Sequence, residues 1–167
     1  MELTKEGFGL NPRFVEGALD RVKPFIESAL DSRFTLSSSS RLVVLVTTSR
    51  FLEQNGMKRP FKEEDSLLIT RFGKDDGWWD KYEQRKDPDK RAGTNWEYYK
   101  QEAMYAVDDW IDLQESGKRR SNWFMVNRGA DSSYGTIVAC AGVSHQFSEM
   151  FASWACAAIR AQTLCGP

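Results

Sequence analysis

The sequence has few of the residues that carry most enzyme and metal chemistry. His145 is the only histidine among 167 residues, and Cys140, Cys156 and Cys165 form an odd set without a C-x-x-C pair. Common zinc sites and disulfide frameworks need more such residues at closer spacing. The composition therefore excludes zinc sites of the common types and favours a reducing compartment. Any imidazole chemistry has to use His145.

Other absences narrow the class of protein further. The chain has 23 basic and 24 acidic residues and a pI near 5.9, so no strong field attracts nucleic acid or an anionic membrane. No apolar run approaches 18 residues, and no basic stretch leads into an apolar one near the N-terminus. Neither G-x-x-x-x-G-K nor G-x-S-x-G occurs. We expect a soluble cytoplasmic protein with neither nucleic acid nor membrane as partner.

The first half of the chain has clear helix and strand signals. Asn11-Pro12 is a typical helix start, and apolar residues at spacings of three and four predict a helix to about Asp31. The β-branched run Leu42–Val46 is typical of a central strand that is covered on both faces. A second strand is predicted over Ser66–Phe72, and Ser49–Asp65 between them is predicted to be a loop.

The second half starts with a charged segment and then repeats the alternation of helix and strand. Gly73–Gly93 is predicted to be a mobile loop within a single domain, residues 1–167. Thr94 and Glu97 match a capping box, which predicts a long helix to about Gln114 with Gly117 as its stop. Its apolar stripe comprises Trp96, Tyr99, Ala103, Ala106, Val107, Trp110 and Ile111. Strands are predicted over Asn122–Val126 and Tyr134–Val143, followed by a helix that opens at Ser144.

This element order predicts the fold class. Helix, two strands, helix, two strands and helix suggest an α+β protein with a single antiparallel sheet and packed helices, in the profilin-like α-β-β-α-β-β-α order. In the last helix we expect Trp154 to lie on the buried side. The companions expected on that side are Phe147, Met150, Phe151, Ala158 and Ala161.

The strand-to-helix junction near the C-terminus is similar to one in a known family. Ile137–Ser144 looks like a strand that ends in a Gly-Val-Ser turn, and alanines repeat in the segment that follows. In both features the chain resembles the haem-binding family that includes the glycolate-operon G protein, a haem-binding sensor protein and the C-terminal domain of the corrinoid adenosyltransferase. The resemblance covers about half the chain. It implies haem as a possible cofactor and a homo-oligomer, although His145 stands where glycine is usual and the Ser49–Asp65 insertion is a further departure.

Candidate site residues follow from this junction and from the aromatic residues. At a helix N-terminus, a neutral His145 can act as a general base, a hydrogen-bond donor or an axial haem ligand, or it can be purely structural. An inward-facing Asp108 or Asp109 would have a raised pKa and acid–base potential, whereas a solvated face is the simpler interpretation. Trp78 and Trp79 belong either to a surface loop or to a lid over a ligand.

Two functions are compatible with these residues. The first is a binding protein for a flat apolar or aromatic molecule such as haem, with a pocket between the sheet and the long helix. The expected ligand-binding residues are Trp78, Trp79, Trp96, Trp110, Trp123 and Ser144. The alternative is a cofactor-free isomerase, cyclase or lyase of natural-product metabolism. Its catalytic residues are expected to be His145 as base, with Asp108, Asp109 or Tyr99 as acid.

Overall fold

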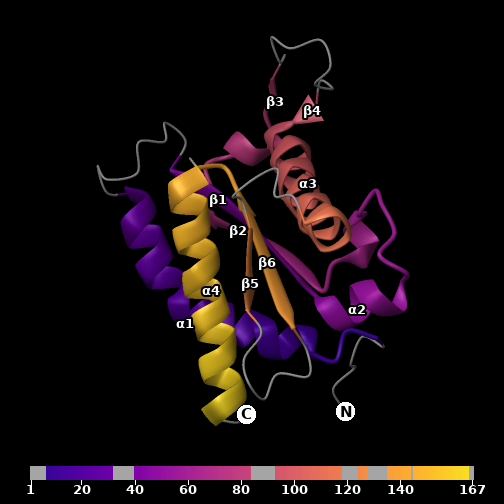
Figure 1. The fold of residues 1–167 in the computed structure, drawn as a ribbon. Coiled ribbons are helices and arrows are strands. Elements are labelled where there is room, and N and C mark those ends of the chain that lie inside the picture. Colours follow the sequence, from indigo (N-terminus) through magenta and orange to yellow (C-terminus); the bar gives the residue numbers. More distant parts are fainter. Residues whose placement is uncertain are drawn as a thin grey trace.

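The computed structural model describes residues 7–31, 40–83, 93–117, 124–127, 135–143 and 145–165. Helices alternate with strands along the chain, and two 3-10 turns, η1 and η2, lie between them (Figure 1). In chain order the elements are α1 Pro12–Asp31, β1 Arg41–Thr48, α2 Ser49–Gln54, η1 Glu63–Asp65, β2 Leu68–Gly73, η2 Trp78–Asp80, β3 Tyr82–Glu83, β4 Gly93–Thr94, α3 Asn95–Ser116, β5 Phe124–Asn127, β6 Thr136–Ala141 and α4 His145–Cys165.

The main sheet has the strand order β2-β1-β6-β5, and every neighbouring pair is antiparallel. All eight residues of β1 are buried, as expected for an interior strand that is covered on both faces. The α+β fold on an antiparallel sheet with packed helices is thus confirmed. The short α2 and the two-residue strands β3 and β4, which pair with each other, are added to the predicted order.

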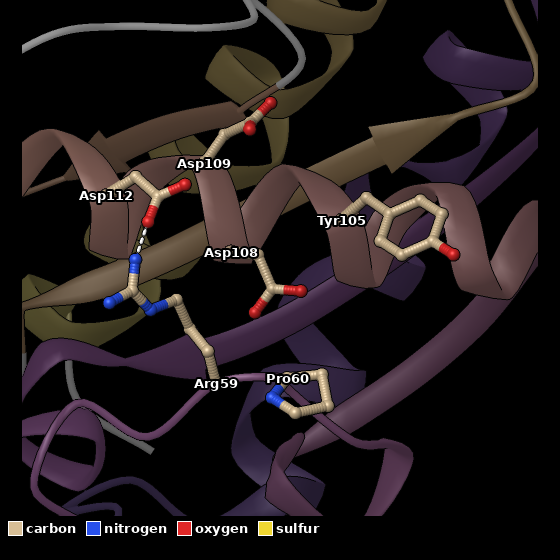
Figure 2. A pocket seen from close by; sticks show the side chains of 6 residues that line it. All are labelled: Arg59, Pro60, Tyr105, Asp108, Asp109 and Asp112. Carbon is tan, nitrogen blue, oxygen red and sulfur yellow. Dashed lines mark ion pairs between the residues drawn. The ribbon is translucent and has the colours of Figure 1, made fainter.

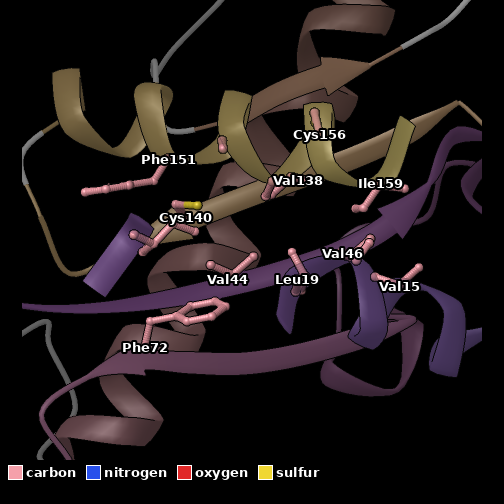
Figure 3. Close-up of a cluster of buried hydrophobic side chains, with 14 of the residues drawn as sticks. Val15, Leu19, Val44, Val46, Phe72, Val138, Cys140, Phe151, Cys156 and Ile159 are labelled. Carbon is pink, nitrogen blue, oxygen red and sulfur yellow. The ribbon is translucent and has the colours of Figure 1, made fainter. Parts of the chain in front are cut away.

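The helices form layers on the two faces of this sheet. Side chains alternate along a strand, so Val44 and Val46 face one layer while Val43 and Leu45 face the other. The first layer contains α1 and α4, and its core is drawn in Figure 3. The second contains α3, whose Val107 and other apolar residues pack against the odd-numbered residues of β1. Figure 1 shows α1 and α4 on one side of the strands and α3 on the other.

Local signals in the sequence set the ends of two helices. The Asn11 side chain accepts a hydrogen bond from the Arg13 N–H at the start of α1. At the start of α3, the Thr94 hydroxyl accepts from the Glu97 N–H at 3.2 Å, and the Glu97 carboxylate accepts from the Thr94 N–H at 3.3 Å. Gly117 ends α3 in a left-handed conformation. The predicted capping box and helix stop are confirmed.

Two loop predictions need correction. The segment Ser49–Asp65 contains α2, because the Thr48 side chain at the end of β1 caps the Phe51 N–H. The predicted mobile segment Gly73–Gly93 contains η2 and the β3–β4 ribbon. Trp79 in η2 is only 1% exposed. The mobility of Gly73–Gly93 stays a prediction, and residues 84–92 lie outside the described residues.

The buried face of α4 differs in part from the expected one. Phe151 is fully buried, as predicted, whereas Trp154, Phe147, Met150 and Ala158 are half-buried. Ala161 is exposed, which corrects its predicted position. The face that meets the core comprises Phe151, Ala152, Ala155, Cys156 and Ile159. No helix within the described part of the chain is long and apolar enough to cross a membrane.

Candidate functional site

Three segments meet at one end of the main sheet. Arg41 at the start of β1 lies opposite Gly73 at the end of β2, and β6 reaches the same end at Ala141, opposite Val43. Gly142 follows with a left-handed φ of +113°, and a Cβ there would lie 2.6 Å from the Arg41 carbonyl oxygen. Only glycine fits this close approach. The β6–α4 junction that the sequence singled out therefore lies beside Arg41.

Four aromatic rings gather near this end of the sheet, and we call them the aromatic corner: Trp78, Trp79, Trp96 and Tyr99. The rings of Trp78 and Tyr99 are stacked, with centroids 5.6 Å apart and planes at 28°. Trp79 meets Trp78 and Trp96 edge-on at 5.1 Å and 5.6 Å. Trp79 is buried beneath them, whereas the other three rings are half-buried. Half-buried side chains leave part of their apolar surface accessible to a ligand.

Backbone and amide contacts hold the two halves of this corner together. The Asn95 side-chain amide donates to the Trp78 carbonyl oxygen at 2.9 Å, and the Asn95 backbone N–H donates to the Lys81 carbonyl oxygen at 3.0 Å. Asn95 is fully buried at the first position of α3. It therefore fixes η2, which carries two of the rings, against the helix that carries the other two.

Three cations surround the rings. The Arg41 guanidinium carbon lies 4.6 Å from the Trp78 centroid, Arg71 lies 5.3 Å from Trp96, and the Lys100 Nζ lies 5.1 Å from Trp96. These distances fall within the range of cation–π attraction. Each cation also has a carboxylate partner: Asp76 for Arg41, Asp75 for Arg71 and Glu63 for Lys100.

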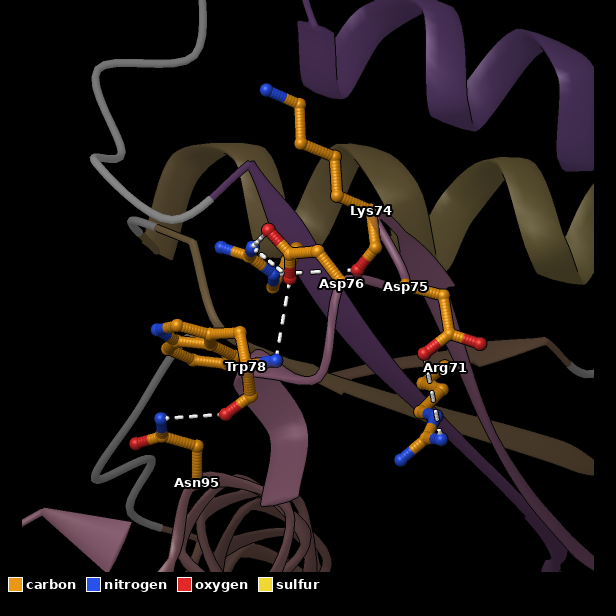
Figure 4. Close-up of polar contacts among 7 residues, drawn as sticks. Arg71, Lys74, Asp75, Asp76, Trp78 and Asn95 are labelled. Atoms are coloured by element: carbon orange, nitrogen blue, oxygen red, sulfur yellow. Dashed lines mark hydrogen bonds and ion pairs between the residues drawn. The ribbon is translucent and has the colours of Figure 1, made fainter. Parts of the chain in front are cut away.

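The Arg41–Asp76 pair is the tightest of the three (Figure 4). Arg41 Nη2 donates to both carboxylate oxygens of Asp76, at 2.7 Å and 2.8 Å, and Arg41 Nε donates to the Lys74 carbonyl oxygen at 3.3 Å. Asp76 Oδ1 also accepts from the Trp78 N–H at 3.3 Å. The hydrogen bond from Arg41 holds the pKa of the Asp76 carboxyl below its usual range.

An acidic hollow of about 510 Å³ lies farther along α3 (Figure 2). It is lined by Arg59, Pro60, Tyr105, Asp108, Asp109 and Asp112. Asp108 Oδ1 accepts from the Phe61 N–H at 2.8 Å, while Arg59 pairs with Asp112. Burial raises the pKa of Asp108, against the lowering effect of the Phe61 hydrogen bond. The expectation of a raised pKa is met at this aspartate.

The predicted site residues divide between these places. Trp78, Trp79, Trp96 and Tyr99 come together at the aromatic corner. Trp110 does not join them, because it is a fully buried core residue between α3 and the sheet.

Asp108 and Asp109 do not approach the β6–α4 junction. The Phe61 segment that Asp108 contacts follows the C-terminal end of β1, whereas the junction adjoins the N-terminal end of β1. Trp123 and Ser144 lie outside the described residues. For His145, the structure describes the backbone at the start of α4 but not the side chain.

Sequence reasoning missed Arg41, Arg71 and Asn95 as parts of this site. From the sequence, Arg41 next to a buried strand indicates only the end of that strand. Its position beside Gly142 depends on the pairing of β1 with β6, which no local signal specifies.

Comparisons of the chain with protein-family models, with curated proteins and with solved structures find no match.

Proposed function

We propose that this protein binds a planar apolar or aromatic small molecule, such as haem, at the aromatic corner. The observation that supports this proposal is the gathering of four rings from η2 and the start of α3, three of them half-buried. A flat ligand can pack against the accessible parts of Trp78, Trp96 and Tyr99 and remove more of their apolar surface from water.

The charges around the rings suit a ligand that also carries carboxylates. Arg41, Arg71 and Lys100 lie within 4.6–5.8 Å of the tryptophan centroids, so ring stacking and carboxylate binding can occur together. The residues present thus fit the flat ring and the two propionates of haem. His145 opens α4 at the same end of the sheet. Its predicted role is that of axial ligand or hydrogen-bond donor.

The proposed site lies at the N-terminal end of α3 rather than beneath this helix. A pocket between α3 and the sheet was expected from the sequence, with Trp110 in its wall. Val43, Leu45, Val107 and Trp110 fill that interface and are all buried. Close packing of these described residues argues against a ligand between them. The half-buried rings at the end of the helix offer the better surface.

For the alternative enzyme, we propose Tyr99 as the acid in preference to Asp108 and Asp109. Tyr99 stacks on Trp78, Arg41 lies over Trp78, and the Arg41 backbone adjoins Gly142. Asp108 and Asp109 line the hollow beside Arg59. A general-base mechanism of His145 would therefore use Tyr99 as its acid, on the same bound ligand.

Titration with haem, followed through the Soret band, tests the proposed function. We expect the parent protein to bind haem, and Trp78→Leu to weaken binding by about three- to tenfold through loss of ring stacking. Trp154→Leu is the matched control, because Trp154 packs in the layer on the opposite face of the sheet. His145→Ala should bind with a changed Soret position if His145 is an axial ligand.

Three results would count against this account. A parent protein that takes up no haem would remove haem as the ligand. Equal losses in Trp78→Leu and Trp154→Leu would place binding away from the aromatic corner. An unchanged Soret position in His145→Ala would exclude axial ligation by this residue. Circular dichroism of each variant shows whether the fold is retained.

A further inference from the structure

We propose that the ligand of the aromatic corner is a planar aromatic carboxylate, and that Asp76 occupies the place of its carboxylate on Arg41 in the ligand-free protein. This inference rests on the proposed function and specifies its ligand class. The carboxylate of the ligand replaces the Asp76 side chain on the guanidinium, while the aromatic ring of the ligand stacks on the tryptophans.

The two partners of this ion pair differ in how firmly they are held. The Arg41 side chain is 10% exposed and belongs to an interior strand, whereas the Asp76 side chain is 57% exposed and belongs to a surface turn. A buried guanidinium needs an anion beside it, because removing its charge from water is costly. An exposed carboxylate can leave the ion pair at a lower free-energy cost, because water can solvate it. Asp76 is therefore the replaceable partner.

The turn that carries Asp76 is exposed and has a glycine at each end. Residues 74–77 are all exposed. Gly73 and Gly77 bound this turn with left-handed φ values of +100° and +82°. At Gly73 a Cβ would lie 2.4 Å from the Ser40 carbonyl oxygen, so glycine is required by the close approach as well. Glycines at both ends allow backbone rotation that carries Asp76 away while β2 stays in place.

The position of Arg41 relative to the rings explains why one ligand would use both. Its guanidinium carbon lies 4.6 Å from the Trp78 centroid, and Trp78 stacks on Tyr99. A carboxylate joined to an aromatic ring by a short chain can reach Arg41 while the ring contacts Trp78. The Asp76 carboxylate already lies at this position, because it binds Arg41 and also accepts from the Trp78 backbone N–H.

Two fluorescent molecules with the same ring distinguish this inference from simple stacking. We use 1-pyrenebutyrate, which ends in a carboxylate, and 1-pyrenebutanol, which ends in a hydroxyl, and measure affinity by fluorescence anisotropy. In Asp76→Asn we expect affinity for pyrenebutyrate to rise by at least about fivefold, since the internal competitor is lost. Affinity for pyrenebutanol should stay unchanged. Arg41→Gln should remove the preference for the carboxylate.

Asp80→Asn is the matched control, because Asp80 is an exposed carboxylate in η2, close to Asp76 along the chain, and is not the carboxylate partner given above for Arg41, Arg71 or Lys100. It changes the net charge equally, so the general attraction of the protein for anions rises as much as in Asp76→Asn. An equal gain in both variants, or a gain for both molecules in Asp76→Asn, would overturn the inference and leave the proposed function intact. If neither molecule bound the parent or any variant, both the inference and the proposed function would be overturned.

Discussion

Two carboxyl groups show how local surroundings set the chemistry of a side chain here. Asp76 is exposed and accepts from a guanidinium, so its pKa lies below the usual range, whereas burial raises the pKa of Asp108. The ionised form of Asp76 is thereby maintained well below neutral pH. Asp108, by contrast, stays protonated to higher pH than an ordinary aspartate.

The raised pKa of Asp108 predicts how the free energy of unfolding depends on pH. The stabilising contribution of Asp108 is full below its pKa in the unfolded chain, about 3.9, and is lost as pH rises through its higher pKa in the folded protein. As pH rises from about 4 to 7, the free energy of unfolding of Asp108→Asn should fall less than that of the parent protein. We expect the difference to be under about 1 kcal/mol, because the group is half-buried. Urea unfolding at several pH values measures the difference.

The substitution keeps an oxygen that can accept the Phe61 N–H, so packing is little altered. Asp20→Asn removes the same formal charge from an exposed position on α1, in the other layer, and controls for net charge. A difference between Asp108→Asn and the parent that is independent of pH, or that changes with the opposite sign, would rule out the burial effect.

At the scale of elements, α4 has one fully buried aromatic anchor and one partly covered neighbour. Phe151 is 0% exposed and packs in the core with α1 and the even-numbered residues of β1. Trp154 lies edge-on to Phe151 at 5.5 Å and is half-buried. The two rings therefore differ in the apolar area that they remove from water.

We expect Phe151→Ala to lower the free energy of unfolding by about 3–5 kcal/mol, because it leaves a cavity between two layers. Trp154→Ala should cost less, since part of its ring already contacts water. Chemical denaturation of both variants measures these losses. A larger loss for Trp154→Ala than for Phe151→Ala would show that the packing of α4 is wrong as described.

The elements that sequence analysis predicted well are those with a local physical cause. Pro12 starts α1, the apolar run from Leu42 forms the interior strand, and Thr94 with Glu97 caps α3. The helix α2 was missed because its cap, Thr48, is also the last residue of a strand. A residue that ends one element and caps the next gives an ambiguous signal, because each element is predicted from its own local pattern.

The site was predictable only in part, for the same reason. Trp78, Trp96 and Tyr99 were singled out by residue type, and the structure brings them together. Arg41 was not, because its contact with Asp76 joins positions 35 residues apart and depends on strand register. Contacts between distant segments are set by the whole sheet and are not visible in a local pattern.

At the scale of the whole molecule, the layered fold limits where a ligand can bind. Helices cover both faces of the sheet, and the interior residues of β1 and β6 are buried throughout. The ends and edges of the sheet remain, and the aromatic corner lies at one end.

Self-association remains a prediction. Within the described residues β2 pairs with β1 alone, so its other edge is where a second copy would add.

The most direct test of the central claim is the ¹H–¹⁵N spectrum of the tryptophan indole groups during titration with 1-pyrenebutyrate. The six tryptophans give one indole signal each, and single Trp→Phe variants assign them. A pyrene ring that stacks at the aromatic corner shifts the signals of Trp78 and Trp96 through its ring current, while those of Trp110 and Trp154 stay in place. Shifts confined to Trp110 or Trp154, with Trp78 and Trp96 unmoved, would contradict the claim.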